Sequence, residues 1–142
     1  MMTAVLMTRY KPSSEAEQQH KADVALAGRR GDLLESAREA ERRFRGAQDR
    51  RAPEAELHRL AVDLDTALTE AMRAAYAAQR AAIGPRGYED RIYRRKARAK
   101  PRVHALTAEA EHLLTLRETH RLTGIPDVPV EPSPAAAPFT AD

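Results

Sequence analysis

The chain has 142 residues, the length of one domain, and its 24 Lys and Arg nearly balance 21 Asp and Glu. It contains no cysteine, which excludes disulfides, thiol catalysis and cysteine-ligated zinc. No apolar run approaches the roughly 20 residues that span a bilayer, and the first residues lack a secretion signal, so we expect no membrane partner and a cytoplasmic protein, or part of a particle assembled there.

Composition favours a helical fold. Ala, Glu, Lys, Leu and Arg make up 78 residues, which is typical of long helices and coiled coils. We therefore expect an all-α chain of three or four helices that form an antiparallel helical bundle or an elongated helical hairpin. The helical domain is predicted over residues 14–124, between an extended N-terminal arm (1–13) and an extended Pro-rich C-terminal arm (125–142).

The first helical segment is predicted to begin at a capping box. Ser14 and Glu17 have the S-x-x-E spacing in which each side chain bonds a free backbone N–H group. The spacing recurs from Asp32, directly after two glycines within four residues. Because each glycine weakens a helix by about 1 kcal/mol relative to alanine, residues 15–50 are either two helices or one helix with a weak middle.

The second part of this segment carries a heptad pattern. Its apolar residues are spaced four and three apart and are predicted to face the core: Leu33, Ala37, Ala40, Phe44 and Ala47. The other face carries acids four residues before bases, at Glu39–Arg43 and Glu41–Arg45. Each such pair stabilises a helix by about 0.2–0.5 kcal/mol.

A long helix is predicted to start at Pro53 and to run to Ile83, because Gly84 and Pro85 follow. Its apolar stripe uses Leu in the first half and Ala in the second, so a partner helix can approach more closely near the C-terminal end. Apolar residues on the opposite side, including Val62, indicate burial on two faces, by other helices or by another subunit. The predicted assembly interface combines this helix with the C-terminal arm: Leu57, Leu64, Leu68, Tyr76, Ile83 and Phe139.

The segment Arg86–Arg102 holds eight Arg and Lys against two acidic residues. We expect a helix that starts near Gly87 or Tyr88, is kinked or restarted at Pro101 and ends at Gly124. Five arginines fall on one predicted helical stripe, flanked by two lysines: Arg91, Arg94, Arg95, Arg98 and Arg102, with Lys96 and Lys100. A row of guanidinium groups binds phosphates in a salt-dependent, largely sequence-independent way. The alternatives are an acidic protein partner and a solvated face.

The C-terminal arm contains five of the nine prolines of the chain. Their spacing favours an extended polyproline-II segment that docks in a groove of another protein. A disordered tail is the alternative.

The sequence offers no catalytic constellation. No serine lies in a G-x-S-x-G turn, and there is no Gly-rich phosphate loop. Glu17–His20 and Glu109–His112 match half of a carboxylate-bridged di-metal motif, but no inward-facing Glu pair completes it. We therefore expect no enzyme, no catalytic residues, no metal, no cofactor and no small-molecule substrate.

The leading functional hypothesis is a non-enzymatic structural or adaptor subunit of a larger assembly, for example a component of a phage or phage-like particle. Few large apolar side chains and long helices predict a domain that is marginal alone, which favours a homo-oligomer or protein assembly partners. In that hypothesis the arms connect neighbouring subunits. The first alternative is a basic helical nucleic-acid-binding protein that acts through Arg91–Arg102. The second is a helical regulator that binds an acidic partner protein.

Overall fold

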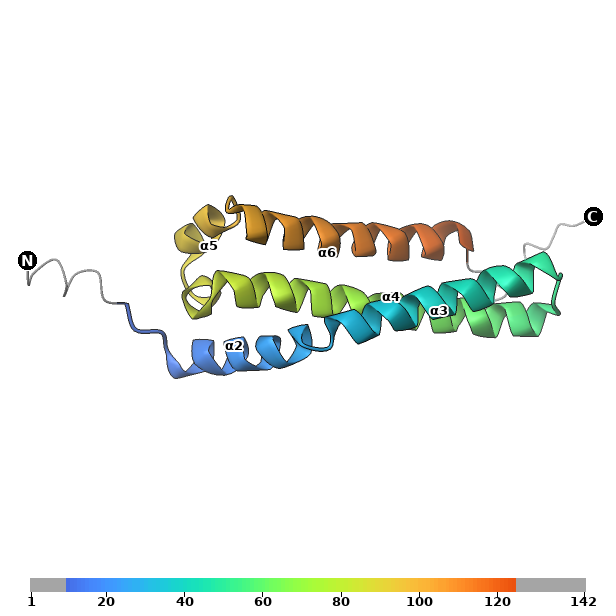
Figure 1. Ribbon diagram of the computed structural model, residues 1–142, viewed down its shortest axis with the longest axis horizontal. Helices are drawn as coiled ribbons and strands as arrows, with labels where there is room; N and C mark the ends of the chain where they lie inside the picture. Colours follow the sequence, from blue (N-terminus) through green and yellow to red (C-terminus); the bar gives the residue numbers. More distant parts are fainter. Residues whose placement is uncertain (1–9, 125–142) are drawn as a thin grey trace, which may run out of the picture. The chain divides into compact units, whose positions relative to one another are not determined.

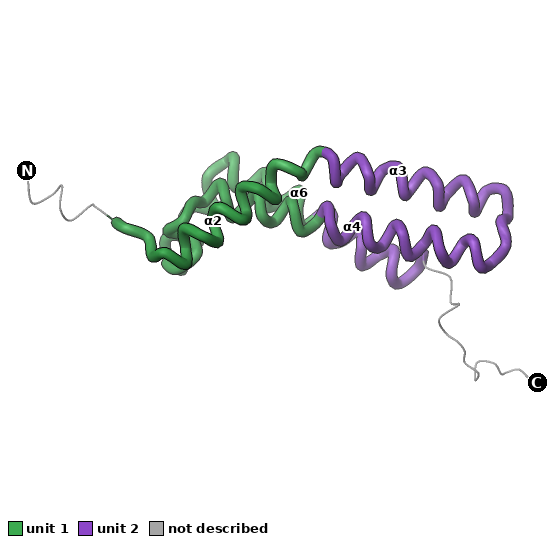
Figure 2. The backbone as a smooth tube through the Cα atoms, turned by 90° about the horizontal axis from the view of Figure 1, so that it is seen from below, with its two compact units in different colours: residues 1–31, 72–111 green, residues 32–71, 112–142 purple. Residues whose placement is uncertain are grey.

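The computed structural model of the chain describes residues 10–124, which belong to two compact units (Figure 2). Unit 1 contains residues 10–31 and 72–111 of this part, and unit 2 contains residues 32–71 and 112–124. All regular structure in residues 10–124 is helical and no strand occurs there, which confirms the all-α prediction. Most of the predicted N-terminal arm and the whole C-terminal arm, with Phe139, lie outside the described residues. No helix within residues 10–124 is long and apolar enough to cross a membrane.

Within the described residues the chain forms five α-helices and two short turns (Figure 1). In chain order they are α2 (Ser14–Ala27), α3 (Arg30–Asp49), α4 (Glu54–Ile83), the 3-10 turn η1 (Pro85–Tyr88), α5 (Arg91–Ala97), α6 (Pro101–Thr119) and the π-helical turn η2 (His120–Gly124). The sequence left open whether residues 15–50 form one helix or two, and they form two. The total of five α-helices exceeds the expected three or four because the last predicted helix is divided into α5 and α6.

Helix α2 is capped by Ser13 rather than by the predicted Ser14. The Ser13 hydroxyl accepts a hydrogen bond from the N–H of Ala16 at 3.0 Å. The same hydroxyl donates to Glu89 at 2.7 Å, and the Ser13 N–H donates to Glu89 at 3.1 Å. This tertiary contact, which the sequence does not show, selects one of two adjacent serines as the cap.

Helix α3 begins earlier than the second predicted capping box. It starts at Arg30, so Asp32 lies in its first turn and not at its cap. Arg30 pairs with Glu109 of α6, and this contact holds the start of α3 within unit 1. A turn at Gly28–Arg29 separates α2 from α3, as the closely spaced glycines indicated.

The end of α3 uses a Schellman motif without glycine. The N–H of Ala52 donates to the carbonyl of Ala47 at 2.9 Å, and the N–H of Arg51 donates to that of Gln48 at 3.1 Å. Arg51 adopts a φ of 53°, in the left-handed region that glycine usually occupies. Helix α4 then starts at Glu54, one residue after the predicted Pro53.

Two glycines shape the chain after α4. Gly84 has a φ of 102° and a ψ of 173°, a backbone conformation found almost only for glycine, and α4 ends at Ile83 as predicted. Gly87 allows close packing, because a Cβ atom there would lie 2.4 Å from Cγ2 of Ile83. The turn η1 can therefore lie directly against the end of α4.

The start of the predicted helix over the basic residues is corrected, and of the kink or restart predicted at Pro101 the structure has the restart. The helix starts at Arg91, because the Asp90 carboxylate caps it by accepting from the N–H of Tyr93 at 3.0 Å. It ends at Ala97, and α6 restarts at Pro101. The predicted single stripe of cations is therefore divided between α5, the turn 98–100 and the first turn of α6.

In unit 1 the C-terminal part of α4 contacts both α2 and α6. His20 of α2 hydrogen-bonds the carbonyl of Ala81 at 3.2 Å, and Gln79 donates to the hydroxyl of Thr107 on α6 at 2.8 Å. Alanines fill the interior of this part of α4: Ala74, Ala75 and Ala77 are at most 1% exposed. A buried apolar cluster of Ile83, Ala97 and Val103 joins α4 to α5 and α6.

In unit 2 the predicted faces of α3 and α4 supply the core. Four of the five seam residues of α3 and five residues of the α4 stripe are buried: Leu33, Ala37, Phe44 and Ala47, with Leu60, Ala61, Leu64, Leu68 and Ala71. His120, which follows α6, bonds the carbonyl of Ala61 at 2.8 Å and meets the ring of Phe44 edge-on at 5.5 Å. Arg121 pairs with Asp65 at 2.6 Å.

These packings account for most of the residues predicted to form an assembly interface. Leu64, Leu68 and Ile83 are buried in the core of their own chain and offer no surface to another subunit. Leu57 and Tyr76 are half-buried. Their burial comes from helices of the same chain, whereas Val62 on the opposite side of α4 is 43% exposed.

Candidate functional site

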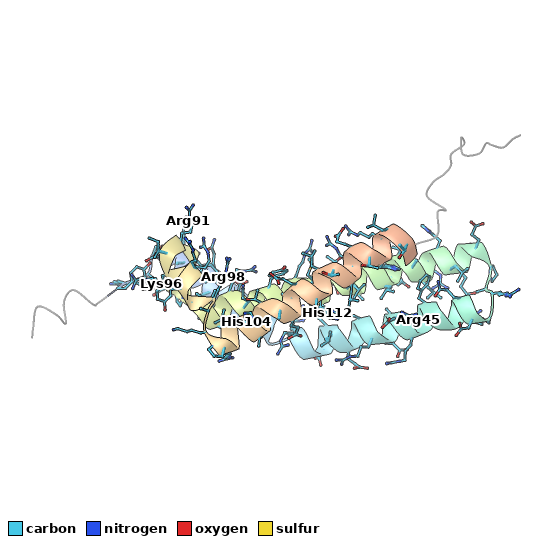
Figure 3. The ribbon with its side chains drawn as sticks, turned by 90° about the horizontal axis from the view of Figure 1, so that it is seen from above. Arg45, Arg91, Lys96, Arg98, His104 and His112 are labelled. Atoms are coloured by element: carbon cyan, nitrogen blue, oxygen red, sulfur yellow. The ribbon has the colours of Figure 1, made fainter. Side chains whose placement is uncertain are left out.

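The basic segment, residues 91–102, has a net charge of +7. It carries seven Arg and Lys and no acidic residue. Its residues lie on α5, the turn 98–100 and the start of α6, all within unit 1. Figure 3 shows Arg91, Lys96 and Arg98 on α5 and the adjacent turn.

Arg86, just before this segment, is occupied by other interactions. Its guanidinium lies 4.7 Å from the ring centroid of Tyr10 and 4.8 Å from that of Tyr93, which are cation–π distances. It also pairs with Asp90 at 3.0 Å. Arg86 therefore stabilises the fold around η1 and contributes little charge to the surface.

The two acidic residues nearest the basic segment are also occupied. Glu89 accepts hydrogen bonds from Tyr10 and Ser13, which lower the pKa of its carboxyl group, and the bond to Glu89 raises the pKa of Tyr10 to about 12. The N–H of Tyr93 and then the guanidinium of Arg86 hold the pKa of Asp90 below its usual range. Both carboxylates are thus ionised at neutral pH, and neither forms an ion pair with the basic segment.

Six cations of the basic segment are exposed: Arg91, Arg95, Lys96, Arg98, Lys100 and Arg102. The seventh, Arg94, is half-buried and donates to the carbonyl of Gly87 at 2.6 Å. None of the seven forms a salt bridge with a carboxylate among residues 10–124. The structure thus brings six of the predicted cations to the surface and turns one inward.

The arginines of α3 show the opposite arrangement. Four of them pair with glutamates of the same helix at three-, four- and seven-residue spacings: Arg38, Arg42, Arg43 and Arg45. The predicted Glu39–Arg43 and Glu41–Arg45 pairs form at 3.1 and 3.0 Å. These four arginines of α3 are therefore neutralised by interleaved acids, and the basic segment has no such acids.

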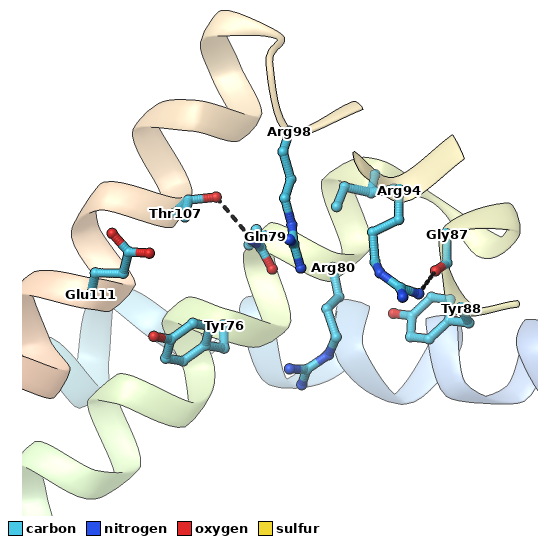
Figure 4. A pocket seen from close by; sticks show the side chains of 10 residues that line it. Tyr76, Gln79, Arg80, Gly87, Tyr88, Arg94, Arg98, Thr107 and Glu111 are labelled. Carbon is cyan, nitrogen blue, oxygen red and sulfur yellow. Dashed lines mark hydrogen bonds between the residues drawn. The ribbon is translucent and has the colours of Figure 1, made fainter. Parts of the chain in front are cut away.

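A cavity of about 530 Å³ lies behind the basic segment in unit 1 (Figure 4). It is lined by residues of α4, η1, α6 and the segment between them: Tyr76, Gln79, Arg80, Ile83, Gly87, Tyr88, Arg94, Arg98, Thr107 and Glu111. Two cations of the basic segment, Arg94 and Arg98, therefore also line the cavity. The predicted interface residues Tyr76 and Ile83 lie in its wall.

One wall of the cavity is fixed by a polar network. Asp23 of α2 accepts from Arg80 at 2.8 and 3.1 Å and from the hydroxyl of Tyr88. Burial acts to raise the pKa of Asp23, but the hydrogen bonds from Arg80 and Tyr88 outweigh it and the pKa is lowered. Burial and the bond to Asp23 together raise the pKa of Tyr88. Arg80 is therefore neutralised, whereas Arg94 and Arg98 are not.

Two residues of the metal half-motifs are bound to other groups. His20 bonds the carbonyl of Ala81, and Glu109 pairs with Arg30. Within residues 10–124 no three His, Cys, Asp or Glu side chains are grouped so that they could hold a metal ion.

Residues far from the basic segment along the chain support the site, and the sequence did not indicate them. Tyr10, Ser13 and Asp23 act on residues more than 55 positions later in the chain, and no local spacing signals such contacts. The cavity was likewise missed, because its lining comes from three separate stretches. The chain matches no protein-family model, no curated protein and no solved structure.

Proposed function

We propose that the protein is a non-enzymatic adaptor that binds the phosphate backbone of nucleic acid through the exposed cations of the basic segment. The helices, arranged as an antiparallel bundle, would present these cations, and the arms would connect the adaptor to its neighbours. A cytoplasmic location fits this role. The single observation that carries the proposal is that six exposed cations lie together without a carboxylate partner among the described residues.

Physical chemistry favours phosphate as the partner of such a surface. Exposed Arg and Lys without ion pairs attract a polyanion and release its condensed counterions on binding, which supplies most of the free energy of non-specific association. The local sequence lacks the side-chain acceptors that would read base edges, such as Asn, Gln or Glu. We therefore expect binding that depends little on base sequence.

The experiment replaces Arg91, Arg95, Lys96 and Lys100 with Gln and measures binding to a short DNA duplex by fluorescence anisotropy. These side chains are exposed and make no hydrogen bond among residues 10–124, so the fold is expected to survive. Loss of four phosphate contacts should weaken binding by about tenfold or more, equally for duplexes of unrelated sequence.

The matched control changes the same number of charges elsewhere. Replacement of Arg38, Arg42, Arg43 and Arg45 with Gln removes four arginines that are paired with glutamates on α3. Duplex affinity of this control should stay within a few-fold of the unmodified protein. If both variants bind equally well, or equally poorly, the basic segment is not the binding surface.

A structural subunit is the second candidate function, and its association surface would use residues other than those first predicted. Unit 2 exposes three large apolar side chains: Val62 at 43%, Leu116 at 41% and Leu122 at 83%. Exposed apolar side chains of this size are found at association surfaces. In light scattering, a species larger than 15.8 kDa that persists at high salt would favour this candidate, because apolar contacts are little screened by ions.

A further inference from the structure

The cavity of unit 1 has the dimensions of a small-molecule site. Its volume of about 530 Å³ falls within the roughly 300–1,000 Å³ of known ligand pockets. Apolar surface comes from Ile83 and from the rings of Tyr76 and Tyr88. Most of the other lining residues carry polar or charged side chains: Gln79, Arg80, Arg94, Arg98, Thr107 and Glu111.

One end of the cavity is positively charged. Arg94 is held there by its bond to the carbonyl of Gly87, and Arg98 extends from the turn after α5 toward Gln79 (Figure 4). Neither guanidinium has a carboxylate within salt-bridge distance among residues 10–124. A guanidinium group binds phosphate through two parallel N–H donors, which makes this end suited to a phosphate group.

Hydrogen-bond acceptors line the cavity next to Arg98 (Figure 4). The hydroxyl of Thr107 donates to the carbonyl of Val103 at 2.9 Å, so it must accept the 2.8 Å bond from Nε2 of Gln79. This fixes the amide of Gln79, a side chain only 6% exposed, with its Oε1 atom directed away from Thr107. The carboxylate of Glu111 lies beside Thr107 on α6 (Figure 4).

We propose that this cavity binds a phosphorylated small molecule of nucleoside monophosphate size. Its phosphate would lie between Arg94 and Arg98, its ring system against Tyr76, and its hydroxyl or amino donors at Oε1 of Gln79 and the carboxylate of Glu111. Free phosphate would occupy only the positive end and leave the acceptors and the Tyr76 ring unused. The ligand is therefore a phosphomonoester with donor groups, rather than phosphate itself.

This site shares Arg98 with the proposed nucleic-acid surface, but the two proposals are tested on different residues. The cavity uses Arg94 and Arg98, whereas the duplex experiment changes four other cations of the basic segment. Failure of either proposal therefore leaves the other standing.

The experiment titrates AMP into the full-length protein and follows binding by calorimetry, with adenosine and inorganic phosphate as parallel probes. AMP should bind saturably with one site per chain. Adenosine lacks the phosphate and phosphate lacks the donors, so each should bind roughly ten- to a hundredfold more weakly than AMP.

Two variants locate the site and one serves as the control. Arg98→Gln removes a guanidinium that makes no hydrogen bond among the described residues, so it should weaken AMP binding by roughly tenfold without changing the thermal midpoint. Glu111→Gln should weaken AMP but leave the binding of phosphate unchanged. Arg91→Gln, which removes an exposed charge outside the cavity lining, should leave AMP binding unaltered.

Three results would overturn the proposal. The first is no saturable binding of AMP. The second is equal affinity for AMP and inorganic phosphate, which would show a simple anion site. The third is equal weakening by Arg98→Gln and Arg91→Gln, which would show attraction to the charged segment as a whole instead of binding in the cavity.

Discussion

At the scale of single residues, the fold of unit 1 depends on a few polar side chains that join distant stretches. Asp23 is the clearest example, because it binds both Arg80 of α4 and Tyr88 of η1. Its lowered pKa means that the folded state favours the ionised form. By linkage, the stabilisation is complete above the ordinary pKa of about 3.9 and is lost as pH falls through the lower pKa of the folded state.

Replacement of Asp23 by Asn tests this assignment. At pH 7 the variant should unfold at lower urea, with a loss of about 1 kcal/mol for a partly exposed charged hydrogen bond. Because the variant has already lost the ionisable group, its stability should fall less than that of the unmodified protein between pH 5 and about pH 2. Urea unfolding followed by circular dichroism at several pH values measures both effects.

Asp63→Asn is the control for Asp23→Asn. Asp63 is an exposed residue of α4 with no ion pair among residues 10–124. The Asp63→Asn substitution should change the free energy of unfolding by less than about 0.5 kcal/mol and leave its dependence on acid pH unaltered. If the stability of Asp23→Asn and that of the unmodified protein changed equally between pH 5 and about pH 2, Asp23 would not be responsible for the acid dependence.

Charge patterns in the sequence predicted some residue contacts and not others. Glu39–Arg43 was predicted because both residues follow a helical spacing on one element. Arg86 was counted with the basic stretch, yet it lies between the rings of Tyr10 and Tyr93. A contact across more than 70 residues depends on the tertiary fold, and no local pattern could assign it.

At the scale of elements, helix ends decide where the cations lie. The breaks at Gly84 and Pro101 were predicted correctly because glycine and proline act locally on the backbone. The late start of α5 at Arg91 was not predicted, because it depends on Asp90 acting as a cap after the 3-10 turn. The predicted core face of α3 is buried at four of its five positions, because helical periodicity is set by the sequence.

The end of α3 provides a test of this element-scale reasoning. Arg51 occupies the left-handed position of a Schellman motif, where a side chain costs about 1–2 kcal/mol relative to glycine. Arg51→Gly should therefore stabilise the protein, by about 0.5–1 kcal/mol after the greater flexibility of unfolded glycine is allowed for. Thermal unfolding measures the change.

Gln48→Gly is the matched control, because Gln48 is exposed, lies on the last turn of the same helix and has an ordinary helical backbone. Glycine at position 48 should destabilise the protein by up to about 1 kcal/mol. If Arg51→Gly also destabilised it, the left-handed conformation at Arg51 would be wrong.

At the scale of the whole molecule, the distribution of charge matters more than its total. The net charge is +3, but the basic segment alone carries +7, so the other 130 residues sum to −4. The sequence predicted this concentration of charge directly. It did not predict which cations are exposed, because that depends on the turn at Arg98 and on the bond that draws Arg94 to Gly87.

The central claim is that these exposed cations bind nucleic-acid phosphates, and the salt dependence of duplex binding tests it most directly. If four to six of the exposed cations contact phosphates, a plot of log affinity against log salt concentration should have a slope of about −3.5 to −5.5. Replacing Arg91, Arg95, Lys96 and Lys100 with Gln should reduce this slope by up to about four units. A slope near zero for the unmodified protein, or the same slope for both proteins, would contradict the account.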